Sequence, residues 1–108
     1  MDSATISKKI VGSWILIKQR LGSTGEVKVA DKNIKAIFNS DSTYVVLEDS
    51  SILTQGNWSL KIVLDNMWGL VLTSPNNYLY GFISFCNNEV SFSFSYLDGN
   101  DNLFEKTN

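Results

Sequence analysis

The chain has 108 residues, with 9 basic and 11 acidic side chains and a formal charge of -2, and we interpret residues 1–108 as one domain. Because this charge is close to neutral, we expect no nucleic-acid partner, whose usual footprint is a basic surface. The absence of histidine and the presence of a single cysteine, Cys86, exclude histidine-dependent triads, an intrachain disulfide and a zinc site built from histidines or several cysteines. The carboxylates fall mostly in turns, so we expect no enzyme, no metal and no cofactor.

The compartment stays open at this level. No apolar run approaches the roughly 20 residues of a membrane-spanning helix, so we expect no membrane span. No apolar leader segment follows Met1, which is compatible with a cytoplasmic protein and equally with a mature exported domain. Cys86 ends an apolar run before a polar turn, and we expect a part-buried side chain there.

Local patterns predict a short N-terminal helical turn followed by strands. Asp2 or Ser3 can cap the helix, Ile6, Ile10 and Val11 share one of its faces, and Gly12 ends it. Alternating and β-branched segments, separated by turns rich in glycine, asparagine, aspartate and serine, then predict strands. In chain order these are Ser13–Gln19, Glu26–Ala30 (half-exposed), Ile34–Phe38, Thr43–Glu48, Ile52–Thr54, Trp58–Leu64, Met67–Thr73, Tyr78–Phe85, Glu89–Tyr96 and Leu103–Lys106.

The segment Glu89–Tyr96 is the clearest of these strands. Val90, Phe92, Phe94 and Tyr96 alternate with serines, as in an antiparallel strand with one face on a core and the other in water. The chain leaves no room for the crossover helices of a parallel sheet. We therefore predict an all-β fold, an antiparallel meander of about 8 to 10 short strands that closes into a barrel to hide its edges, with a β-sandwich as the alternative.

Four motifs, in this order along the chain, suggest a family. They are Gly12-Ser13-Trp14, the stretch Phe38-Asn39-Ser40-Asp41-Ser42-Thr43-Tyr44, Gly56-Asn57-Trp58, and Phe104-Glu105-Lys106. The chain thus resembles the lipocalin superfamily of calycin-like barrels, and most closely its small bacterial lipocalin-like domains. The resemblance implies that Trp14 packs across one barrel end beneath a basic side chain of the last strand. Lys106 is the basic residue available there, where an arginine is usual.

The aromatic side chains bear on whether the barrel has a ligand pocket. A barrel of roughly eight strands is either filled by its own side chains or wide enough for one small ligand. If a pocket exists, we expect Tyr44, Trp58, Phe92 and Phe94 to form its wall, because each lies on the more apolar side of its strand. The first hypothesis is then a non-catalytic lipocalin-like module that binds a small hydrophobic ligand inside the barrel.

The second hypothesis is a structural or protein-interaction module with a filled barrel. Some strands are apolar on both faces: Ile15 and Ile17 oppose Trp14 and Leu16. Such a strand must cover something outside the barrel as well as inside it. The N-terminal segment or a second copy of the chain, in a homodimer, is the expected cover.

Overall fold

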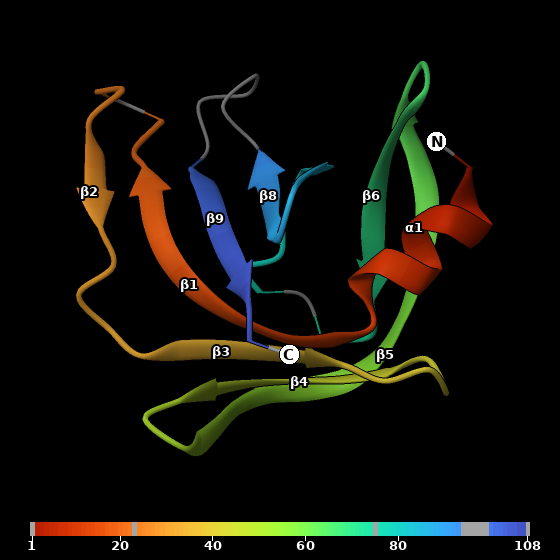
Figure 1. Cartoon of the computed structure of the whole chain (residues 1–108), viewed down its shortest axis with the longest axis horizontal. Coiled ribbons are helices and arrows are strands. Elements are labelled where there is room, and N and C mark those ends of the chain that lie inside the picture. The colour runs from red at the N-terminus through yellow and green to blue at the C-terminus, as the bar shows by residue number, and fades with distance from the viewer. Residues whose placement is uncertain (1, 23, 75, 94–99, 108) are drawn as a thin grey trace.

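Figure 1 shows the protein as a computed structural model in which an antiparallel sheet closes into a barrel, with a short helix beside β5 and β6. The structure describes residues 2–22, 24–74, 76–93 and 100–107. These residues form nine strands and one helix. The predicted all-β meander barrel with a short N-terminal helix is thereby confirmed.

The elements follow one another with short connections. The helix α1 spans Ser3–Ile10. The strands are β1 (Gly12–Arg20), β2 (Val27–Val29), β3 (Ile34–Phe38), β4 (Thr43–Glu48), β5 (Ser51–Leu64), β6 (Met67–Leu72), β7 (Phe82–Cys86), β8 (Glu89–Ser93) and β9 (Asp101–Lys106).

The helix α1 is capped and anchored as its sequence indicates. The Asp2 Oδ1 accepts a hydrogen bond of 2.9 Å from the Thr5 backbone N–H, and this bond is the main cause of a lowered pKa of the Asp2 carboxyl. Ile6 and Ile10 are buried on one face of the helix. Gly12 then has a φ of 135°, a conformation that favours glycine, where the chain leaves the helix and enters β1.

Closure of the barrel depends on β1, which pairs along both of its edges. On one edge, its first residues pair with β3 and its last residues with β2. On the other edge it pairs with β9, from Trp14 opposite Lys106 to Arg20 opposite Asp101. The strands from β3 to β9 each pair with the next, so β1 and β3–β9 form a closed ring and β2 is an extra edge strand. All strands of the described residues belong to one sheet, so they do not form the two packed sheets of a β-sandwich.

Two strand predictions were wrong in their extent. The segments Ile52–Thr54 and Trp58–Leu64 are parts of the single strand β5, because the residues between them continue to pair with β4, as Gly56 does with Tyr44. The segment Tyr78–Phe85 forms a strand only from Phe82 onward. The Asn76 Oδ1 accepts hydrogen bonds from the backbone N–H groups of Tyr78 and Leu79, and these bonds hold a loop there.

Exposure differs from expectation at two places, and one further predicted strand is described only in part. The segment Glu26–Ala30 was predicted half-exposed, but Val27 and Val29 on the edge strand β2 are 54% and 73% exposed. Cys86 is exposed rather than part-buried. The strand predicted to run to Tyr96 is described as β8 up to Ser93, and residues 94–99 lie outside the described residues.

Gly56 is a point of close approach between β5 and the segment that follows β6. A Cβ atom at this position would collide with Thr73 Oγ1, which also accepts a hydrogen bond of 2.9 Å from the Asn57 backbone N–H. The glycine of the Gly56-Asn57-Trp58 motif therefore has a packing role, because it lets Thr73 lie directly against β5.

We expect Gly56→Ala to lower the free energy of unfolding by about 1–3 kcal/mol, because the added methyl group overpacks this contact. Urea denaturation measures the loss. In a Thr73→Ala background the hydroxyl is gone and the remaining neighbours, Tyr44 Cε1 at 3.4 Å and the Cβ of residue 73 at 3.5 Å, are near ordinary contact distance. The same substitution is then expected to cost less. An equal loss in both backgrounds would contradict the role assigned to Thr73.

Candidate functional site

The barrel interior is occupied by the chain's own aromatic side chains. The ring of Phe38 lies 6.0 Å from the ring of Trp58, edge to face, and 6.4 Å from the ring of Tyr44. Phe92 and Phe104 form a second edge-to-face pair, 5.7 Å between centroids. These geometries are favourable for aromatic pairs. The space where a ligand was expected is thus taken, at these positions, by side chains that pack on one another.

Three of the four residues predicted to form a ligand-binding wall, Tyr44, Trp58 and Phe92, belong to one buried hydrophobic cluster. Tyr44 is 2% exposed and its hydroxyl donates a hydrogen bond of 2.6 Å to the Ser74 carbonyl. Phe92 is completely buried. Phe94 lies outside the described residues. Trp58 lines the groove described below, and Tyr44 lines a different hollow, of about 530 Å³.

The barrel end nearest α1 is organised around Trp14. This side chain is buried, and its Nε1–H donates a hydrogen bond of 2.8 Å to the Ile10 carbonyl at the end of α1. The Lys106 ammonium lies 5.5 Å from the centre of the Trp14 ring, within range of a cation–π interaction. The structure therefore brings Trp14 and Lys106 together, at the end of the barrel where β1 meets α1. On the same side, the Lys9 ammonium lies 5.6 Å from the centre of the Phe85 ring.

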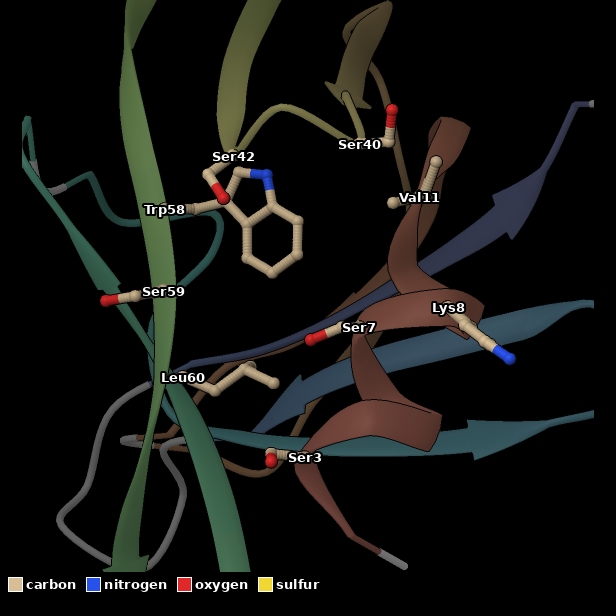
Figure 2. Close-up of a pocket in the computed structure, with 9 residues that line it drawn as sticks. All are labelled: Ser3, Ser7, Lys8, Val11, Ser40, Ser42, Trp58, Ser59 and Leu60. Atoms are coloured by element: carbon tan, nitrogen blue, oxygen red, sulfur yellow. The ribbon is translucent and has the colours of Figure 1, made fainter.

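A groove of about 640 Å³ lies between α1, β5 and the turn that joins β3 to β4 (Figure 2). In Figure 2, Trp58 and Leu60 extend from β5 toward the helix, and Ser7 extends from the helix toward them. The groove is lined by both apolar and polar side chains. Its lining residues are Ser3, Ser7, Lys8, Val11, Ser40, Ser42, Trp58, Ser59 and Leu60.

Hydrogen bonds hold the groove wall in place. The Trp58 Nε1–H donates a hydrogen bond of 3.2 Å to the Asn39 carbonyl, which fixes the indole against the turn between β3 and β4. In that turn, the hydroxyl and the backbone N–H of Thr43 both donate to Asp41 Oδ1, at 2.6 and 3.1 Å. These bonds, with the hydroxyl bond as the larger effect, lower the pKa of the Asp41 carboxyl.

The groove combines apolar side chains with hydroxyl groups. Trp58, Leu60 and Val11 offer apolar surface, and the serines of α1 and of the β3–β4 turn offer hydroxyl groups that both donate and accept hydrogen bonds. Ser59 extends from the opposite side of β5. The serines were missed at the sequence level. Ser3 and Ser7 are four residues apart and therefore share one helix face, which was the signal available. Ser40 and Ser42 belong to the recognised Phe38–Tyr44 motif, but only the fold brings them opposite the helix.

Comparisons of the chain with protein-family models, with curated proteins and with solved structures find no match. Among the described residues, no helix has the length and apolarity needed to span a membrane. A group of three or more cysteine or carboxylate side chains that could hold a metal ion is also absent from this part of the chain. The function is therefore argued from the geometry of the groove.

We expect the turn between β3 and β4 to make the free energy of unfolding depend on pH in the acid range. The folded state lowers the pKa of Asp41 below 3.8, so the carboxylate stabilises the fold above that value, and this contribution is lost as the pH falls through the lowered pKa. Asp41→Asn should therefore be less stable than the natural chain at neutral pH and lose less stability in acid. Urea denaturation over a pH series measures the free energy of unfolding of the natural chain and of the variant at each pH.

Thr43→Val provides the matched comparison, because it removes the hydroxyl that donates to Asp41. It should flatten the acid dependence in the same direction as Asp41→Asn. Parallel pH profiles for the natural chain and both variants would show that this turn does not contribute to the acid dependence.

Proposed function

We propose that this protein is a non-catalytic, lipocalin-like binding module that holds a small amphipathic molecule in the groove between α1 and β5. The observation that carries the proposal is about 640 Å³ of open space beside Trp58 and Leu60, with serines of α1 and of the β3–β4 turn among its other lining residues. Small-molecule sites are typically concave, with volumes of roughly 300–1,000 Å³ and a largely apolar lining with a few polar groups.

The proposed ligand lies at the rim of the barrel rather than deep inside it. The aromatic pairs of the interior, such as Phe92 with Phe104, would have to separate to admit a ligand. Such packed cores resist rearrangement, because each lost contact costs dispersion energy. The groove needs no such rearrangement to receive a ligand.

The lining indicates how the ligand would be held. Its apolar part would cover Trp58 and Leu60, and its polar part would exchange hydrogen bonds with the serines. In Figure 2, the exposed Lys8 extends away from Trp58 and Leu60, so its positive charge would act on a ligand from a distance. A ligand with a neutral or negative polar end fits this arrangement best.

The position of Trp14 supports the lipocalin-like part of the proposal. The resemblance implies a tryptophan from a Gly-x-Trp motif at one barrel end, covered by a basic residue of the last strand. Trp14 and Lys106 have this relationship, 5.5 Å apart, with lysine in place of the usual arginine.

A second candidate function, a structural or protein-interaction module that associates with another copy, is favoured by β2. This strand pairs with β1 on one side only, and Val27 and Val29 are exposed. An edge strand with exposed apolar side chains is a template for pairing with another chain. Light scattering over a range of concentrations, with Val29→Lys as the comparison, tests this candidate: a concentration-dependent dimer that Val29→Lys abolishes would support it.

The groove proposal is tested by fluorescence titration of the full chain with anilinonaphthalene sulfonate, a small amphipathic anion. We expect saturable binding of one molecule per chain. Ser7→Leu places a larger side chain in the groove and is expected to weaken binding about tenfold or more, a change of about 1.4 kcal/mol.

Thr5→Leu is the matched control, because residue 5 lies on the same helix, is exposed, and does not line the groove. This variant should bind like the natural chain. Non-saturable binding, or an equal effect of Ser7→Leu and Thr5→Leu, would contradict the groove as the binding site.

A further inference from the structure

A second hollow lies at the other end of the barrel, remote from α1, and has a different chemistry. Its volume is about 460 Å³, and its lining is made mainly of amide side chains. Gln19 comes from the far end of β1 and Leu53 from the start of β5, while Asn76, Asn77 and Tyr78 precede β7 and Asn100 directly precedes β9. The lining residues are Gln19, Leu53, Asn76, Asn77, Tyr78 and Asn100.

Asn76 is the most informative of these residues. Its Oδ1 accepts hydrogen bonds from the backbone N–H groups of Tyr78 and Leu79, at 2.9 and 3.2 Å, and these bonds settle which end of the amide is the oxygen. The Nδ2 at the other end is buried and has no hydrogen-bond partner within the described part of the chain. A buried donor without an acceptor costs about 1–3 kcal/mol, so a shift of this side chain that opens Nδ2 to the hollow and pairs it with an acceptor there would be favourable.

The side-chain amides of Gln19 and Asn100 in this hollow each have one of their two polar atoms in a hydrogen bond within the protein. Gln19 Nε2 donates a hydrogen bond of 2.8 Å to Asn102 Oδ1, and Asn102, which is 1% exposed, donates in turn to the Asn77 carbonyl at 3.1 Å. This arrangement leaves the Gln19 Oε1 as an acceptor. Asn100 Oδ1 accepts from the Gly22 backbone N–H at 3.1 Å, which leaves its Nδ2 as a donor.

We propose that this hollow, the mouth site, binds a neutral polyhydroxyl molecule of the size of a simple sugar. Asn100 supplies a donor and Gln19 an acceptor, and Asn76 supplies a second donor once its side chain shifts to open Nδ2 to the hollow. A hydroxyl group donates and accepts at once, so a molecule with several hydroxyls matches this mixed set. The ring of Tyr78 and the side chain of Leu53 add apolar surface for the carbon atoms of such a molecule.

The lining also discriminates against other ligands. None of the six lining residues carries a charge, so an anion would lose its hydration without gaining an opposite charge. A single water would satisfy the Asn76 donor but occupies about 30 Å³, a small part of this volume. The mouth site is independent of the groove, because the two share no lining residue.

The test is an NMR titration of the isotope-labelled full chain with glucose, N-acetylglucosamine and maltose, and with acetate as the anionic comparison. We expect the side-chain amide signals of Asn76 and Asn100 to shift saturably with at least one sugar and not with acetate. The indole signal of Trp58, which reports on the groove, should not move.

Asn76→Asp is the decisive variant, because a carboxylate can still accept from Tyr78 and Leu79 but cannot supply the donor. It is expected to weaken sugar binding about tenfold or more, and Asn100→Asp, which likewise keeps its bond to Gly22, should also weaken it. Asn87→Asp in the β7–β8 turn makes the same chemical change outside the mouth site and should bind normally.

The variants are first compared by thermal unfolding, and Asn100→Asp decides the matter if Asn76→Asp does not fold. The proposal would be overturned if no sugar produced a saturable shift, which would leave water alone as the partner of Asn76. Tighter binding of acetate than of any sugar, or sugar binding that the folded variants leave unchanged, would also overturn it.

Discussion

The hydrogen-bonded ladder between β1 and β9 is the interaction on which the rest of the structure depends. It joins the first and last strands of the ring from Trp14–Lys106 to Arg20–Asp101, with a register shift between Leu16 and Lys18. Without this ladder the meander would expose two long edges. The barrel end next to α1 would also lose the strand pairing that places Lys106 over Trp14. The closed ring also sets the width of the interior, because the diameter of a barrel grows with its number of strands.

That width explains where the open space lies. A barrel of eight strands is just wide enough for side chains to fill it. The aromatic side chains of Phe38, Phe92 and Phe104, each no more than 1% exposed, occupy its middle. The hollows described above are therefore at the two ends. The groove beside α1 combines Trp58 and Leu60 with serines, and the mouth site combines amides from three segments of the chain. The two proposals thus assign different ligand chemistries to opposite ends of one barrel.

Much of the fold was predictable from local patterns, and most of the groove was not. Ile34–Phe38 and Thr43–Glu48 were predicted to the residue, because alternation and polar turns bound them on both sides. The loop before β7 was missed because Tyr78, Leu79 and Tyr80 have strand-like side chains, while the decisive bonds come from Asn76. Trp58 was identified, but Ser3 and Ser40 are far apart in sequence and line the same groove only because the fold places α1 next to the β3–β4 turn.

Side chains of the chain itself fill the barrel interior, and we propose that ligands are held at the two ends of the barrel. Xenon, which enters apolar cavities, tests this claim directly when it is titrated while the methyl NMR signals of Val46 and Val90 are followed. Both side chains are completely buried in the core. The account predicts no saturable shift of these methyl signals. A saturable shift at both valines would reveal an interior cavity and contradict it.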